Sequence, residues 1–265
     1  MHKKYYDPIE NRLIYAQRKA TKENWDKLWS SCNDDFYNTK PRCLSLINKT
    51  KQYLDTNSRV LEGGCGLGAL TYALDRNKFD AVGLDFAPQV IKRINKHWGH
   101  LNVVTGDVMN LPFDDASFDG YWSLGVIEHF PDGYELIASE MKRVIKSGGF
   151  LFLTFPSMNG LRKSKALSCK YDNLNQNLQE MKDFYQFALD PLSVINNFSN
   201  KGFILKERSS KGTLHGIEDE IKQLSTFIKY LNSSSSRLTQ LIDLILDRVI
   251  GHYFAHVTLL VFEKI

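Results

Sequence analysis

The sequence predicts an α/β fold in which helices cover both faces of a largely parallel β-sheet. From residue 59 onward, short apolar runs alternate with amphipathic helical runs, and strands that alternate with helices form parallel sheets joined by helical crossovers. Of the 265 residues, 43% are hydrophobic and 24% are charged. This is the composition of an ordinary globular protein with a sizeable core, and it excludes intrinsic disorder.

The first part of the chain predicts a helical segment. Asp7-Pro8-Ile9-Glu10 has the composition of a helix start, because Asp caps a helix, Pro fits its first turn and Glu lies three residues after the cap. Aromatic residues follow at Tyr15, Trp25 and Trp29. We expect residues 1–57 to form an N-terminal helical cap.

The strand and helix patterns then alternate. The predicted strands are Arg59–Glu62, Ala81–Asp85, Asn102–Thr105, Gly120–Leu124, Gly149–Phe155, Phe203–Glu207 and His256–Phe262. Helical patterns fill most intervals, namely Leu67–Arg76, Pro88–Trp98, Tyr134–Ile145 and Pro191–Lys201. Two segments depart from this order. Pro156–Leu189 is polar and basic, and Ile217–Ile250 predicts two amphipathic helices separated by the serine-rich patch Asn232–Ser236.

A glycine-rich loop predicts a nucleoside-binding site. Glu62-Gly63-Gly64-Cys65-Gly66-Leu67-Gly68 joins an apolar strand to a helix, and glycines there let backbone N–H groups approach a ligand closely. Asp85 ends the next strand, 23 residues after Glu62. A carboxylate at that position can bind both ribose hydroxyls.

Two cofactors are compatible with this loop. Gly64-x-Gly66-x-x-Ala69 also satisfies the loose dinucleotide fingerprint, which would indicate an NAD(P)-dependent oxidoreductase. Glu62 distinguishes the two, because a carboxylate two residues before Gly64 would repel a pyrophosphate. S-adenosyl-L-methionine (SAM) carries an ammonium and a sulfonium and no phosphate. The sign of the charge therefore favours SAM.

Five motifs in order carry a family resemblance: VLEGGCGLG, AVGLDFAPQVI, VVTGDVMNLPFDDASFD, GVIEHF and VIKSGGFLFLTFP. They resemble the class I SAM-dependent methyltransferases, in particular the small-molecule, quinone-biosynthesis-like branch (methyltransferase domain types 11 and 25). The resemblance implies a doubly wound, Rossmann-like seven-stranded sheet with its last strand antiparallel. It further implies a SAM-binding core at 58–156, an acceptor-side insertion at 157–190, and the rest of the core with two late helices at 191–265.

The resemblance also implies which residues bind the cofactor. Glu62, Gly64, Gly66 and Gly68 would surround the methionine part, Asp85 the ribose, and Phe86, Asp107 and Val108 the adenine, while the Ser123–Leu124 backbone would approach the methionine amine. Tyr15, Trp25 and Trp29 are candidates for a lid over the cofactor. Trp29 is predicted to cover it, with core packing as the alternative, and for Trp25 core packing is favoured. Gly63 stands where the family usually has an apolar residue, and we expect looser packing behind the loop.

Transfer of a sulfonium methyl group is a one-step in-line displacement that alignment and the exclusion of water can promote. His129 is the predicted general base, and the alternative is that it orders its loop or contacts the cofactor. Tyr185 is predicted to lie over the acceptor, with core packing as the alternative. The basic residues of Arg162–Lys170 either attract an acceptor that carries a carboxylate or phosphate, or form a solvent-exposed face.

Charge, cysteines and hydropathy restrict the partners. The net charge is only +4 and no base-reading motif is present, so we expect a small-molecule acceptor and no nucleic acid. The four scattered cysteines suit neither zinc nor a disulfide scaffold. No membrane span and no secretory signal are predicted, which favours the cytoplasm. The apolar stripe of the late helices packs on the sheet, forms a homodimer or covers a lipid-like acceptor. A SAM-binding protein without catalytic activity remains an alternative.

Overall fold

The computed structural model describes residues 3–16, 21–39, 41, 43–173, 183–233 and 237–265. The chain divides into two compact units. Unit 1 comprises residues 1–19, 154–197 and 207–260, and unit 2 comprises residues 20–153, 198–206 and 261–265. Each unit is therefore assembled from segments that are distant in the sequence.

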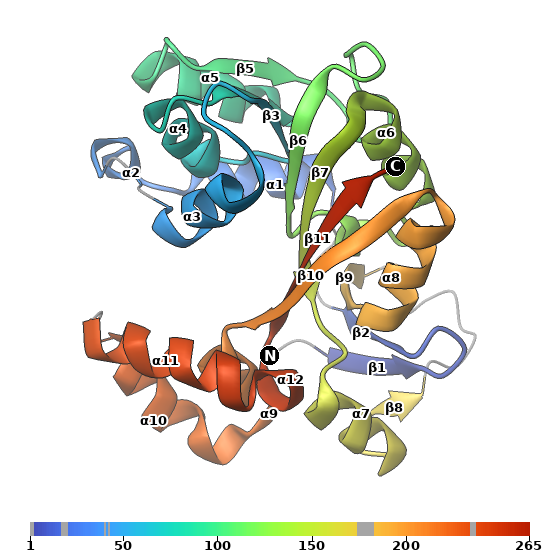
Figure 1. Cartoon of the computed structure of the whole chain (residues 1–265). Helices are drawn as coiled ribbons and strands as arrows, with labels where there is room; N and C mark the ends of the chain where they lie inside the picture. Colours follow the sequence, from blue (N-terminus) through green and yellow to red (C-terminus); the bar gives the residue numbers. More distant parts are fainter. Residues whose placement is uncertain (1–2, 17–20, 40, 42, 174–182, 234–236) are drawn as a thin grey trace. The chain divides into compact units, whose positions relative to one another are not determined.

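The main sheet has seven strands in the order β10-β11-β7-β6-β3-β4-β5 (Figure 1). Their bounds are β3 Arg59–Gly63, β4 Asp80–Asp85, β5 Asn102–Thr105, β6 Phe118–Leu124, β7 Ile145–Pro156, β10 Phe203–Lys211 and β11 Val257–Lys264. Strand β3 pairs in parallel with β4 and with β6, and β4 pairs in parallel with β5. All seven predicted strands are confirmed, with ends that differ by a few residues.

Hydrogen bonds at both ends of β11 fix its direction. Ile265, just past the end of β11, donates to Gly202, just before β10, over 3.0 Å. His256, just before β11, donates to Gly212, just after β10, over 3.2 Å, while the His256 carbonyl accepts from Ser157, just after β7. Strand β11 is therefore antiparallel to both neighbours, and the predicted α/β fold with an antiparallel last strand is confirmed.

The helices of unit 2 lie before and between these strands in the sequence. They are α1 Lys22–Ser30, α2 Asp35–Asn38, α3 Leu44–Tyr53, α4 Ala69–Arg76, α5 Pro88–His97, the 3-10 turn η1 Ile127–His129 and α6 Glu135–Val144. Figure 1 shows α3, α4 and α5 on one side of β3, β6 and β7 and α6 on the other. This two-sided cover follows from the right-handed crossovers of a parallel sheet.

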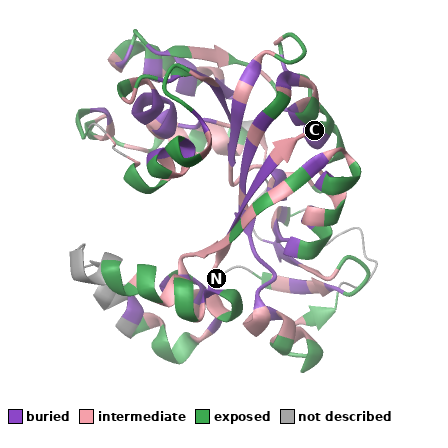
Figure 2. Cartoon of the chain, in the orientation of Figure 1, coloured by how far each residue is buried: buried purple, intermediate pink, exposed green. Residues whose placement is uncertain are grey.

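The centre of the sheet is tightly packed. Trp122 and Phe152 are fully buried and stack with ring centroids 4.5 Å apart, and the strands β3 and β6 are largely buried (Figure 2). A Cβ atom built on Gly63 would lie 2.0 Å from the Tyr121 hydroxyl oxygen. The expectation of looser packing behind Gly63 is wrong, because the ring of Tyr121 occupies the space that a side chain there would need.

The N-terminal residues form a hairpin in unit 1. Strands β1 Lys3–Asp7 and β2 Arg12–Ala16 pair antiparallel in a second sheet of order β8-β1-β2-β9, with β8 Asp172–Asn173 and β9 Phe184–Ala188. The carboxylate of Asp7 accepts bonds from the backbone of Ile9 and Glu10 and from the Arg12 side chain. The helix predicted to begin at Asp7 is wrong, because Asp7 caps a turn instead.

The other helices of unit 1 are α7 Gly160–Leu167, α9 Thr213–Glu220, α10 Lys222–Ser233, α11 Arg237–Val249 and α12 Gly251–Phe254. Helix α8 Pro191–Asn200 continues from unit 1 into unit 2. The two predicted late helices correspond to α10 and α11, and residues 234–236 of the predicted serine-rich separator lie outside the described residues. No helix in the described part of the chain combines the length and the hydropathy that a membrane span needs.

A buried ionic cluster joins the segments of unit 1. The guanidinium of Arg162 is fully buried and donates to Glu220 Oε1 (3.0 Å) and to Asp219 Oδ2 (2.9 Å). Lys4 binds both carboxylates at 2.8 Å, and Lys165 binds Glu220 Oε2 at 2.7 Å. The predicted basic segment is thus matched by carboxylates of the chain itself.

Candidate active site

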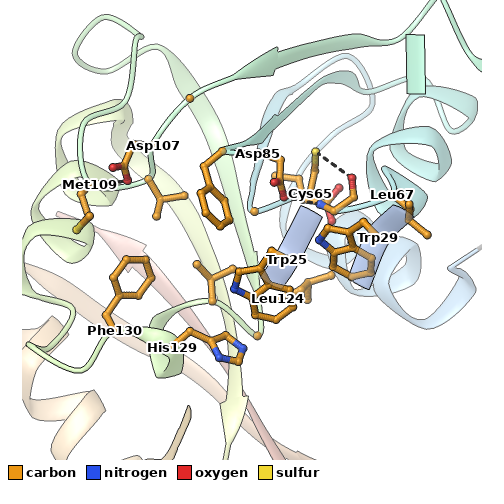
Figure 3. Close-up of a pocket in the computed structure, with 18 of the residues that line it drawn as sticks. Trp25, Trp29, Cys65, Leu67, Asp85, Asp107, Met109, Leu124, His129 and Phe130 are labelled. Carbon is orange, nitrogen blue, oxygen red and sulfur yellow. Dashed lines mark hydrogen bonds between the residues drawn. The ribbon is translucent and has the colours of Figure 1, made fainter. Parts of the chain in front are cut away.

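A cavity of about 550 Å³ lies within unit 2, at the carboxyl ends of β3, β4 and β6 (Figure 3). The β3–α4 loop, the ends of β4 and β6, the segment after β5, helix α1 and the turn η1 all contribute to its wall. Ligands of doubly wound sheets bind at this edge, where the strand order reverses. Of the predicted cofactor residues, the cavity wall contains Trp29, Glu62, Gly64, Gly66, Asp85, Phe86, Asp107, Val108 and Leu124.

The glycine loop takes a conformation that other residues adopt with difficulty. Gly64, Gly66 and Gly68 have φ angles of +77°, +49° and +77°, in the left-handed region that glycine tolerates. A Cβ atom on Gly64 would lie 2.7 Å from Val126 Cγ2, and one on Gly66 would lie 3.1 Å from Trp29 Cζ2. The loop therefore keeps its backbone free to meet a ligand. Gly68 is not in the cavity wall; it precedes α4 and packs beside Ile94.

Glu62 ends β3 at the bottom of the cavity and is buried. Its Oε2 accepts a bond from the Thr71 backbone N–H at 2.8 Å and one from the Thr71 hydroxyl at 2.6 Å. Burial raises the pKa of Glu62 to about 7, and the two bonds from Thr71 oppose that rise. A nearby cation would restore the ionised carboxylate at neutral pH.

Asp85 ends β4 and binds the glycine loop. Its Oδ2 accepts from the backbone N–H of Gly66 at 2.9 Å, and its Oδ1 accepts from Ala87 at 3.0 Å. Burial raises the pKa of Asp85, while these backbone bonds lower it. The carboxylate is thus held in a fixed orientation at the place where a ribose would lie.

The side chains of the cavity wall give it a negative character. Three carboxylates, Glu62, Asp85 and Asp107, line it, and no Lys or Arg is found among its described lining residues. Neither Glu62 nor Asp85 has a cationic partner in the part of the chain that the structure describes. Such a site fits a cationic nucleoside such as SAM, and it lacks the positive groups that a diphosphate needs.

Phe86, Asp107, Val108 and Met109 form another part of the cavity wall. Asp107 is exposed, and its Oδ1 accepts from the Met109 backbone N–H at 2.9 Å. Figure 3 shows Asp107 and Met109 at one end of the cavity and the indole of Trp29 at the other. The wall is therefore long enough to contact a nucleoside at several points.

Of the two residues predicted at the end of β6, only Leu124 lies in the cavity wall. Leu124 lines the cavity, as do Gly125 and Val126 after it. Ser123 is fully buried and is not in the wall, and its hydroxyl has no hydrogen-bond partner within the described residues.

Two indole rings form one side of the cavity. Trp25 and Trp29 lie one turn apart on α1 and stack with centroids 5.9 Å apart. Core packing was favoured for Trp25, although the spacing of four residues already places both rings on one helix face. The other lining residues that sequence reasoning missed are Phe36, Cys65, Leu67, Ala69, Gly106, Met109, Gly125, Val126, Phe130 and Pro131.

His129 lies in the cavity wall beside these indoles. Its ring packs edge-on against Trp25 with centroids 4.9 Å apart. Behind it, Glu128 is buried, with Oε1 at 4.0 Å from His129 Nε2 and Oε2 without a partner in the described residues. Burial raises the pKa of Glu128 to about 8. Sequence reasoning gave Glu128 no role, because nothing in the sequence shows its burial.

Tyr185, the second predicted catalytic residue, lies on β9 in unit 1. It packs against a cluster of buried side chains that includes Leu13, Tyr15 and Met158, and it is not in the wall of the cavity. Its catalytic role stays a prediction.

The sheet order, the glycine loop and the acidic cavity define a class I SAM-dependent methyltransferase domain. Comparison with known families agrees, since residues 61–153 match the methyltransferase domain family Methyltransf_11. This region of the chain belongs to that family, with SAM as its cofactor, and the oxidoreductase alternative is not supported.

Curated relatives match part of the chain. Demethylmenaquinone methyltransferase of Staphylococcus carnosus (strain TM300) is 31% identical over 150 residues, which are 51% of this chain and 61% of that protein. Malonyl-[acyl-carrier protein] O-methyltransferase of Herminiimonas arsenicoxydans is 39% identical over 101 residues, 37% of each chain. The match spans less than two thirds of either relative.

Solved structures share the fold more widely. The putative methyltransferase in complex with the Trm112 activator of Haloferax volcanii has a TM-score of 0.60 at 17% identity, covering 92% of this chain and 97% of that one. A putative sarcosine dimethylglycine methyltransferase from Galdieria sulphuraria has a TM-score of 0.54 at 19% identity, covering 94% and 90%. At this identity the likeness concerns the fold alone.

Proposed function

We propose that the chain transfers the methyl group of SAM to an oxygen or nitrogen atom of a small-molecule acceptor by in-line displacement. The observation that carries this proposal is the cavity, whose wall combines three carboxylates with aromatic side chains in one space. Its volume of about 550 Å³ lies in the range of small-molecule sites. The relatives named for small-molecule methylation support the acceptor class.

The protein's own residues hold the cofactor. Glu62 and the backbone of Gly64 and Gly66 would bind the aminoacyl part, Asp85 the ribose hydroxyls, and Asp107 the adenine amino group. When bound, SAM supplies a methyl group that its sulfonium already activates. Most of the rate enhancement would come from alignment by this rigid loop.

The aromatic and apolar side chains of the cavity wall would select and desolvate the acceptor. Trp25, Phe130 and Pro131 line the cavity together with Val126, which favours a flat, largely apolar acceptor over a highly charged one. These side chains also exclude water, so that hydrolysis and solvation of the nucleophile are suppressed.

His129 is the proposed base for an acceptor that keeps its proton at neutral pH. A neutral imidazole in the cavity wall can accept that proton as the methyl group arrives. His129→Ala is expected to lower turnover by about 100-fold while S-adenosylhomocysteine binds as before. A loss of only a few-fold would instead assign His129 to ordering its loop.

Two measurements test the function. Thermal unfolding with S-adenosylhomocysteine, NADH or NADPH should give a raised midpoint with the first ligand alone. Transfer of label from methyl-tritiated SAM to a panel of phenols, hydroquinones, carboxylic acids and amines should then identify the acceptor class. A midpoint shift without transfer to any acceptor would support a SAM-binding protein without catalytic activity.

Two further expectations belong to this proposal. The acceptor is not nucleic acid, which a gel-shift titration with single- and double-stranded DNA and RNA would test. The protein acts in the cytoplasm, which fractionation of cells would test. A homodimer is one of three uses that the sequence leaves open for the apolar stripe of residues 217–250, and light scattering after gel filtration would detect it.

A further inference from the structure

Helix α11 is turned so that its acidic residues face the protein. Asp247 Oδ1 accepts from the Thr213 backbone N–H at 2.9 Å and from its hydroxyl at 2.7 Å. Asp243 Oδ1 accepts from the Leu214 N–H at 2.9 Å. These donors belong to the first turn of α9, whose N-cap Gly212 has no side chain to satisfy them.

This capping decides which face of α11 meets solvent. Asp243 and Asp247 are four residues apart and therefore share one helix face, so that the apolar residues occupy the others. Leu241 and Ile245 are 52% and 51% exposed. Ile242, Leu244 and Val249 on α11, with Leu224 on α10 and Tyr253 on α12, are also exposed. We call these seven residues the apolar surface.

Exposed large apolar residues are concentrated in α10–α12. Of the fifteen large apolar residues that are exposed in the described part of the chain, these seven fall between residues 224 and 253. Single exposed leucines are common on protein surfaces, whereas several exposed apolar residues on one helix, as on α11, indicate a binding surface.

Cations outnumber acids in the sequence of these helices. Between residues 221 and 253 the sequence has four cations, Lys222, Lys229, Arg237 and Arg248, and two acids, Asp243 and Asp247. Both acids are engaged with α9, while Lys222 and Arg248 are exposed. The surroundings of the apolar surface therefore favour an anionic partner.

We propose that the apolar surface of α10–α12 lies on a lipid bilayer that contains anionic headgroups. Apolar side chains with flanking cations are the composition of helices that lie in the membrane interface, and the 13 residues of α11 are too few to span a bilayer. A second copy packed through the same surface would offer these cations no acidic partner from α11, because Asp243 and Asp247 are bonded to α9.

Sedimentation of the full chain with vesicles tests the proposal. Vesicles of phosphatidylcholine in which about a third of the lipid is phosphatidylglycerol should bind the protein, less so as salt rises from about 0.1 M to about 0.5 M. Vesicles of phosphatidylcholine alone should bind it weakly. No binding to the anionic vesicles would overturn the proposal.

Matched variants locate the contact. Leu241→Asn with Ile245→Asn should lower the fraction bound at least about fivefold, whereas Leu136→Asn with Leu192→Asn, equally exposed leucines on α6 and α8, should leave it unchanged. Arg248→Glu should weaken binding to the anionic vesicles only. Each variant should retain the midpoint rise with S-adenosylhomocysteine, which reports that it is folded.

Two results would contradict the assignment of this surface. One is equal vesicle binding by the Leu241/Ile245 variant and the wild type. The other is a wild-type dimer in light scattering that the same variant dissociates, since the apolar surface would then be covered by a second copy.

Discussion

The carboxylate of Glu62 at the end of β3 receives both hydrogen bonds that Thr71 of α4 can donate, at 2.8 Å from its backbone N–H and 2.6 Å from its hydroxyl. The same carboxylate lines the cavity and is buried, which raises its pKa to about 7. The charge of Glu62 at neutral pH therefore depends on the ligand that occupies the cavity.

Cofactor binding should depend on pH through Glu62. The ammonium of S-adenosylhomocysteine favours the ionised carboxylate, so binding releases the proton that Glu62 still carries below pH 7. Affinity should therefore rise with pH, by at most about tenfold per unit, and level off above about pH 7. Titration calorimetry with S-adenosylhomocysteine measures this, with 5′-methylthioadenosine, which lacks the ammonium, as the weakly dependent control. The same slope in Glu62→Gln would contradict the prediction.

Thr71→Val should change that pH dependence without removing the carboxylate. Losing the hydroxyl donor raises the pKa of Glu62 further, so affinity at pH 7 should fall by roughly 3- to 10-fold and recover at higher pH. Thr50→Val is the matched control, because the Thr50 hydroxyl bonds Trp122 within the core. Calorimetry at two pH values distinguishes the variants, and equal losses at both pH values in Thr71→Val would argue against this role.

The glycine loop offers a test of space against backbone strain. Gly64 and Gly148 have φ angles of +77° and +76°, but a Cβ atom on Gly64 would meet Val126 at 2.7 Å, whereas one on Gly148 would meet nothing within 4 Å. Both alanine variants should lose about 1–2 kcal/mol of stability from strain. Gly64→Ala alone should also lose affinity for S-adenosylhomocysteine, by at least about tenfold. Comparable affinity in the two variants would show that the loop tolerates the added methyl group.

Glu128 should make stability fall as pH rises. Its pKa is raised to about 8 in the folded chain, so the unfolded state loses its proton first. The free energy of unfolding therefore decreases between about pH 4.5 and pH 8, by about 1.4 kcal/mol at most for each unit. Glu128→Gln should raise the unfolding midpoint clearly at pH 8.5 and little at pH 5. An equal rise at both values would point to packing instead of charge.

The ionic cluster of unit 1 should be sensitive to the loss of one member. Arg162→Met leaves Asp219 and Glu220 without their buried partner and should cost about 3–5 kcal/mol. Lys206→Met removes a partly exposed pair with Glu263 and should cost about 1 kcal/mol or less. Urea unfolding followed by circular dichroism measures both. Similar costs would mean that Lys4 and Lys165 compensate for the missing guanidinium.

Much of unit 2 could be predicted from the sequence, because its signals are local. Apolar runs, a glycine loop and the two acids Glu62 and Asp85 near the ends of their strands follow each other at short spacing. Both carboxylates lie in the cavity wall. Core packing was favoured for Trp25 and Glu128 was given no role, since only the packed structure shows that Trp25 lines the cavity and that Glu128 is buried next to His129.

The N-terminal hairpin could not be predicted for a different reason. The pair Asp7-Pro8 is compatible both with the start of a helix and with a turn. The neighbouring residues do not distinguish between these two structures. The choice depends on strand β9, which pairs with β2 from about 170 residues further along the chain. A long-range partner of this kind leaves no periodic signal in the segment itself.

The same hairpin has a consequence for biosynthesis. Lys4 and Tyr15 bind Asp219, which the ribosome adds more than 200 residues after them. Until Asp219 has been synthesised, Leu13, Ile14 and Tyr15 therefore stay exposed. These side chains are buried in unit 1 of the folded chain. A nascent chain in that state is a natural client for a chaperone that shields apolar segments.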